Sequence, residues 1–174
     1  MADFLPSDLD GLASHFRSLC VELAGEAEAL KVERVSFSDW ASEIRPALIE
    51  AIEMAESTDS NAIVFRIRPD VGWKGELGIH HDYQPDSVSL IPTDPDRPFE
   101  EYSYNSPNEI VDGPRHEPAA RLLQKHRLGK GTRPSGPGLY LIARCLAEFV
   151  QLTNSLEANT RIFISFMWAV FRVK

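Results

Sequence analysis

Residues 62–83, "AIVFRIRPDVGWKGELGIHHDY", decide the fold, because they hold two segments in which apolar and polar side chains alternate. In "AIVFRIR" (62–68) an isoleucine or phenylalanine stands at every second position. Alternation with a period of two predicts a β-strand with one strongly apolar face. The segment "GELGIHHDY" (75–83) alternates in the same way, so we expect a sheet built around these two strands.

The second strand carries the candidate chemistry of the chain. Successive side chains of a strand point to opposite faces. One face is therefore expected to carry Leu77, Ile79, His81 and Tyr83, and the other Glu76, His80 and Asp82. Imidazole and carboxylate groups are both metal ligands and acid–base catalysts. The favoured interpretation is that Glu76, His80 and Asp82 lie on the solvated side of an antiparallel sheet. We predict no metal and no cofactor, since the spacing matches no known signature such as H-E-x-x-H; a metal site of these three residues is the alternative.

The rest of the chain adds helices and further strands. An apolar spacing of three and four predicts a helix over 8–33. A second helix is expected to begin near Pro46, because proline is tolerated in the first turn of a helix but not in its interior. Further expected elements are a short strand at 87–91, an irregular segment at about 92–114 with an edge strand near Tyr102–Tyr104, helices over 118–128 and 139–153, and a central strand in 160–174, for which a buried helix is the alternative.

Together these elements predict one α+β domain over residues 1–174 in the order ααβββααβ. The expected sheet is mainly antiparallel, with four to five strands packed by about four helices. A chain of 174 residues is too short for two full domains. No apolar run is long enough to span a membrane and the first residues do not resemble a signal peptide, so a cytoplasmic protein is expected. Cys20 and Cys145 fall on apolar helical positions and are predicted to be buried, reduced thiols.

The charge is unevenly distributed along the chain. The formal net charge is −8; residues 1–60 hold 13 acidic against 4 basic side chains, and residues 86–112 hold 7 against 1. This balance argues against duplex nucleic acid as the ligand, because such binding depends on neutralising phosphates. It favours a basic protein partner, although a charged surface without any partner is the alternative.

A basic segment reverses this sign. Residues 115–133 hold 6 basic against 1 acidic side chain, and Lys130 and Arg133 precede glycines at the start of a predicted helix. Backbone amides at a helix N-terminus favour anions, so Lys130 and Arg133 are a candidate anion site. The segment lacks the complete phosphate-loop pattern, and an exposed loop without a ligand is the alternative.

Two classes of function follow. The favoured one is a non-catalytic binding protein, a small acidic inhibitor of the type of a bacterial immunity protein or antitoxin that neutralises a basic toxin or enzyme. Aromatic and acidic side chains would form its partner surface, since Trp and Tyr dominate interface hot spots. These predicted partner-binding residues are Trp73, Asp94, Asp96, Glu100, Glu101, Tyr102 and Tyr104. The alternative is a small hydrolase or phosphate-handling enzyme that uses His80 and Asp82, with His116 as a further catalytic candidate and Lys130 and Arg133 holding an anion.

Overall fold

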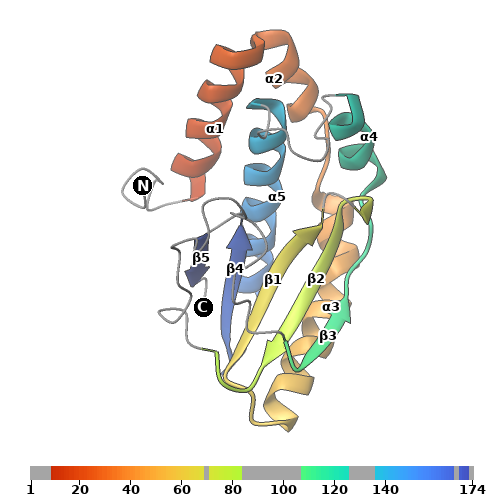
Figure 1. Cartoon of the computed structure of the whole chain (residues 1–174), viewed down its shortest axis with the longest axis vertical. Helices are drawn as coiled ribbons and strands as arrows, with labels where there is room; N and C mark the ends of the chain where they lie inside the picture. The colour runs from red at the N-terminus through yellow and green to blue at the C-terminus, as the bar shows by residue number, and fades with distance from the viewer. Residues whose placement is uncertain (1–8, 69–70, 84–106, 126–135, 167–168, 173–174) are drawn as a thin grey trace, which may run out of the picture.

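The structure, a computed structural model, describes residues 9–68, 71–83, 107–125, 136–166 and 169–172 (Figure 1). These residues form five helices and one five-stranded sheet, which confirms the α+β class. The helices are α1 (Leu9–Ala24), α2 (Glu26–Glu33), α3 (Ser38–Ser57), α4 (Glu117–Lys125) and α5 (Gly136–Asn154). The strands are β1 (Ala62–Arg68), β2 (Lys74–His80), β3 (Glu109–Asp112), β4 (Arg161–Phe166) and β5 (Ala169–Arg172).

The sheet has the strand order β3-β2-β1-β4-β5 and is mixed rather than wholly antiparallel. β1 pairs with β2 and with β4, antiparallel to the first and parallel to the second, and the two outer pairings are antiparallel. Parallel neighbours need a long crossover connection, and the chain between β1 and β4 contains the helices α4 and α5. β1 and β4, which form this parallel pair, lie inside the sheet and β3 forms one edge.

The helices cover one face of the sheet, with α3 and α5 passing behind the strands in Figure 1. Ile63 and Phe65 of β1 point to this face, and the Phe65 ring stacks on Phe149 of α5 at 3.8 Å between centroids. α3 lies close beneath the sheet edge because Gly75 and Gly113 have no side chain. A Cβ atom at these positions would stand 2.8 and 3.2 Å from the Ile44 Cδ1 atom of α3.

Two of the expected helices have different limits. The expected helix over 8–33 breaks at Gly25, whose φ of 90° is unfavourable for other residues, and becomes α1 and α2. The expectation that the second helix begins near Pro46 is wrong, because α3 begins at Ser38 with Pro46 inside it. Trp40 and Ile44, both buried in the first turns of α3, stabilise this earlier start. The chain therefore has five helices, not four, among the described residues.

The strands also differ from the expectation in two places. β3 lies inside the segment that was expected to be irregular, and it pairs with β2 from Glu76↔Asp112 to Ile79↔Glu109. The segment 160–174 forms two antiparallel strands, β4 and β5, in place of one. The strands expected at 87–91 and near Tyr102–Tyr104 lie outside the described residues.

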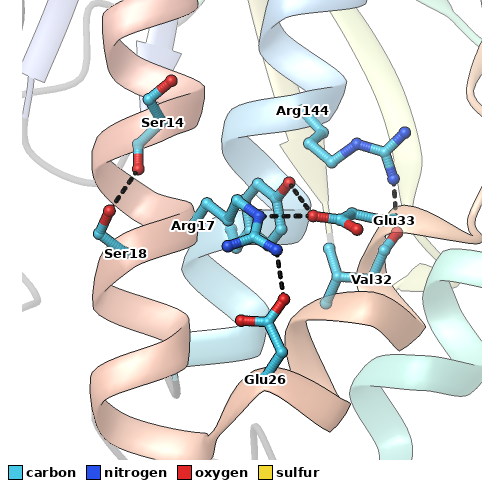
Figure 2. Close-up of polar contacts among 8 residues, drawn as sticks. Ser14, Arg17, Ser18, Glu26, Val32, Glu33 and Arg144 are labelled. Atoms are coloured by element: carbon cyan, nitrogen blue, oxygen red, sulfur yellow. Dashed lines mark hydrogen bonds and ion pairs between the residues drawn. The ribbon is translucent and has the colours of Figure 1, made fainter.

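Polar contacts join α1, α2 and α5 above the sheet (Figure 2). Arg17 of α1 pairs with Glu26 at 2.5 Å and with Glu33 at 2.7 Å, and the Tyr140 hydroxyl donates to Glu33 at 3.3 Å. The hydrogen bond from Arg17 holds the pKa of the Glu33 carboxyl below its ordinary value. Arg144 of α5 donates to the backbone oxygen of Val32 at 2.5 Å. Arg17 therefore connects α1 to α2, while Arg144 binds the carboxyl end of α2.

We expect Arg144→Met to lower the free energy of unfolding by about 2 kcal/mol, since hydrogen bonds to charged groups contribute about 1.5–3 kcal/mol. The variant loses the donations to Val32 and, at 2.9 Å, to Val35, and the cation over the Phe37 ring at 5.7 Å. Urea denaturation measures the change. The matched variant Arg17→Met, which breaks more exposed ion pairs, should cost clearly less. Equal losses would mean that the α2 end does not depend on Arg144.

Both cysteines are buried and neither forms a disulfide, as predicted. Burial raises the pKa of the Cys20 thiol and of the Cys145 thiol, so both stay protonated at neutral pH. Of the helices in the described ranges, none combines the length and the apolar character that a membrane crossing requires.

Candidate functional site

His80 lies at the end of β2 on the sheet face opposite the helices. The residue is only 3% exposed, so the expectation of a solvated sheet face is wrong at this position. The ring leans back over Gly78, where a Cβ atom would stand 3.3 Å from the His80 Nε2 atom and 3.0 Å from the Pro107 Cβ atom. Tyr83 lies beside it, with ring centroids 4.9 Å apart. The absent side chain at Gly78 therefore leaves room for a buried imidazole.

A small apolar cluster surrounds this ring. Tyr83 packs with Ala62, Val64 and Phe163, and its ring lies 5.0 Å from that of Phe163. The sequence pattern placed Tyr83 on the opposite face from His80. That expectation is wrong because β2 ends at His80, and the chain then turns so that Tyr83 packs on the His80 side. Asn61 fixes the turn by accepting from the Tyr83 amide at 2.8 Å.

The electrostatics of the site keep His80 neutral. Burial, and next the positive charge of Arg66 on β1, lower the pKa of the His80 imidazole from 6.5 to about 4. The Nε2 atom is buried and has no hydrogen-bond partner among the described residues. A neutral imidazole with an unpaired nitrogen can accept a proton or hydrogen bond, so the site has the chemistry of a weak base.

The structure does not bring the other proposed ligands to His80. Glu76 stands four residues earlier on the same strand, about 13 Å away along β2, and lies 3.5 Å from Arg68. Asp82 follows the end of the strand and is exposed. Within the ranges that the structure describes, no three His, Cys, Asp or Glu side chains lie close enough together to hold a metal ion. Glu76, His80 and Asp82 are therefore not assembled as one site.

His116 has a different position and a structural contact at each ring nitrogen. Its Nδ1 atom accepts from the Ala119 amide at 3.0 Å, which caps the start of α4. Its Nε2 atom must then carry the proton, and it donates to the Ser36 backbone oxygen at 2.8 Å. The His116 amide bonds to Gly72, before β2 begins, whereas His80 is the last residue of β2 about 20 Å further along. The two histidines do not share a site.

Trp73 is fully buried, with 0% of its side chain exposed. Its ring packs beside Phe37, with centroids 6.4 Å apart. The expectation of an exposed Trp73 is therefore wrong. The apolar side chain lies in the core beneath β2, and it offers no anchor on the surface.

The other predicted site residues lie outside the described residues. They are Asp94, Asp96, Glu100, Glu101, Tyr102 and Tyr104 of the expected partner surface, and Lys130 and Arg133 of the expected anion site. Their roles stay predictions.

An acidic surface that the sequence pattern indicated only as net charge lies on the outer side of α3. We call the "α3 acidic face" the exposed carboxylates Asp39, Glu43, Glu50 and Glu53. Their spacing of four, seven and three places them on one side of the helix. In the described part of the chain none of these four carboxylates forms an ion pair or side-chain hydrogen bond. Ile49, 38% exposed, lies one turn before Glu53 at the margin of this face, so an exposed apolar side chain borders the carboxylates.

The spacing of these carboxylates could have been recognised in the sequence. The net charge of residues 1–60 does not show which helix face carries it, and a helix that begins near Pro46 leaves Asp39 and Glu43 outside it, whereas α3 begins at Ser38. Gly78 could not be recognised in this way, because its role depends on Pro107, a residue of another segment.

Comparisons with known proteins yield no relative: no protein-family model, no curated protein and no solved structure matches this chain. Function is therefore inferred from the geometry of the described residues.

Proposed function

We propose that this chain is a non-catalytic protein-binding module, a small acidic inhibitor of the immunity-protein or antitoxin type that binds a basic protein partner. The observation that supports it best is the α3 acidic face, whose four exposed carboxylates form no ion pair with any cation in the described ranges. An apolar contact with a charged rim is the usual anatomy of a protein interface. Ile49 supplies the apolar contact and the carboxylates supply the rim.

The charge distribution supports a basic partner. Unpaired surface carboxylates create a negative potential that attracts a cationic protein and raises its association rate. The net charge of −8 acts in the same direction over the whole chain. The predicted partner residues at 94, 96 and 100–104 add four more carboxylates and two tyrosines to this proposal.

The test begins with affinity capture of a partner from the source lysate and continues with binding kinetics. We expect Glu50→Gln/Glu53→Gln to slow association about 3- to 10-fold and to change the dissociation rate little, because exposed rim charges act mainly on diffusional encounter. The association rate of the unmodified protein should also fall steeply above about 0.15 M salt, where the Debye length is about 8 Å.

The matched control is Glu117→Gln/Glu157→Gln, which removes the same charge from exposed positions outside α3. It should slow association less than the α3 variant does. An equal effect would mean that net charge alone, and not the α3 acidic face, accelerates association with the partner. Capture of an acidic partner would refute the proposal.

A second candidate function is the hydrolase or phosphate-handling enzyme, and the unpartnered Nε2 atom of His80 is the observation in its favour. Turnover of a phosphate or ester substrate that His80→Gln abolishes, in a variant with an unchanged circular dichroism spectrum, would support it. The burial of His80, the exposure of Asp82 and the distance to His116 make the binding module the better supported function.

A further inference from the structure

Some backbone groups of the edge strand β3 have no partner among the residues that the structure describes. In the ladder with β2, Gly113 donates to Gly75 at 2.8 Å, so the odd-numbered residues of β3 point their amide and carbonyl groups at β2. Because these directions alternate along a strand, the amide and carbonyl groups of Ile110 and Asp112 point away from the sheet. β3 ends the strand order, and no hydrogen bond to these groups is present in the described chain.

The side chains of this edge are exposed as well. Ile110, 56% exposed, stands opposite Gly78 and so points to the face without helices. On that face Asp112 is neutralised by Lys74 at 2.5 Å. The outer side of the edge is therefore apolar at Ile110 and carries little net charge.

The helix side of the same edge is acidic. Arg45 and Glu56 of α3 bond to Ser155 and Asn159, which follow α5, so they mark the flank of α3 that faces α5. Residues two apart on a helix lie on nearly opposite sides, so Glu43 lies on the flank away from α5. Glu50 is two turns further along the same flank. α3 packs against β2 and β3, as Figure 1 shows, so this flank lies below the open edge of β3.

We infer that the β3 edge and the flank of α3 that carries Glu43 and Glu50 bind an extended basic segment of a protein partner, which adds to the sheet as a strand beside β3. The inference rests on the proposed function and specifies its partner. Backbone hydrogen bonds to Ile110 and Asp112 would supply affinity, as in other cases of strand addition to an exposed edge. Successive side chains of the added strand would point alternately to Ile110 and to the α3 carboxylates. The partner segment should therefore alternate apolar and basic residues.

The probe for this inference is a capped octapeptide of alternating lysine and valine, added to the full-length protein. Amide hydrogen exchange is followed by NMR. We expect saturating peptide to slow exchange at the Ile110 and Asp112 amides by about tenfold or more, because these amides become hydrogen-bonded. The Val111 amide, already bonded to β2, should change much less.

Two further comparisons separate strand addition from simple charge attraction. A peptide with the same sequence but N-methylated at every second residue keeps its charge and loses half of its backbone donors, and it should bind at least about tenfold more weakly. Glu43→Gln/Glu50→Gln should weaken the unmethylated peptide more than Glu117→Gln/Glu157→Gln, which removes two exposed carboxylates outside α3.

The outcomes distinguish this inference from the proposed function. Binding without protection at Ile110 and Asp112, or equal binding of the methylated peptide, would overturn strand addition. No binding of the lysine peptide would overturn it too. In each case the proposed function still stands if a captured basic partner associates more slowly with Glu50→Gln/Glu53→Gln than with the unmodified protein. If association is not slowed, the proposed function is refuted, whatever the result with the peptide.

Discussion

Replacing Trp73 by alanine is expected to lower the free energy of unfolding by about 3–5 kcal/mol, the usual cost of truncating a large buried aromatic side chain. The side chain is completely buried and packs beside Phe37 in an aromatic group that also includes Trp40. The Phe37 ring cannot move far into the space left by the indole, because it also stacks on His116, with ring centroids 4.8 Å apart. The cavity should therefore stay largely open, and urea denaturation should show the loss.

Trp73→Gly supplies a sharper comparison. Trp73 has a φ of 59°, in the left-handed region that a residue with a Cβ atom adopts at a cost of about 1–2 kcal/mol and that glycine adopts freely. Both variants lose the same indole, but only alanine keeps the backbone strain. We expect Trp73→Gly to be at least as stable as Trp73→Ala, the reverse of the usual order inside regular elements. A glycine variant clearly less stable than the alanine variant would show that the φ of Trp73 costs nothing.

The alternating pattern of residues 62–83 predicted β1 and β2, because the faces of these two strands differ strongly in polarity. The same rule failed at Tyr83, since alternation holds only while the strand continues and nothing in "HHDY" marks its end at His80. The pattern also gave no sign of β3, in which Val111 is the only buried residue of four. A strand of that length is defined by its ladder with β2, a contact between distant segments that no local pattern contains.

The candidate site also depends on contacts between distant segments that the sequence pattern does not contain. Sequence reasoning selected His80 for its residue type and could not foresee its burial, which depends on Gly78, Pro107 and Tyr83 meeting around the ring. Trp73 was selected as a surface anchor because aromatic residues are common in interfaces, but large apolar side chains are also the ones that a core buries. Residue type therefore identified chemically capable side chains, while their exposure was decided by packing.

His80 should make the stability of the protein fall as the pH is lowered from 6.5 to 4. The folded state holds the pKa of the His80 imidazole at about 4, against an ordinary value of 6.5. Above pH 6.5 the ring is neutral in both the folded and unfolded states, so its protonation makes no contribution to the free energy of unfolding. Between pH 6.5 and pH 4 the His80 ring is protonated in the unfolded state but mostly neutral in the folded state, so the free energy of unfolding decreases with falling pH. A shift of this size corresponds to about 3 kcal/mol at pH 4 and below.

The variant His80→Phe isolates this contribution, because phenylalanine keeps an aromatic ring beside Tyr83 and cannot be protonated. Its free energy of unfolding, measured by urea denaturation at pH 7.0, 5.5 and 4.0, should decline less than that of the unmodified protein, with the difference growing to about 3 kcal/mol at pH 4. Carboxyl groups such as Glu33 also titrate at low pH, but they are common to both proteins and cancel in the difference.

The control His81→Gln changes the exposed neighbouring imidazole and should keep the full decline. At pH 7 the phenylalanine variant should be at least as stable as the original, since it removes a buried nitrogen without a hydrogen-bond partner among the described residues. Parallel pH profiles for His80→Phe and the unmodified protein would show that the His80 ring is solvated in solution, and they would favour the enzyme over the binding module.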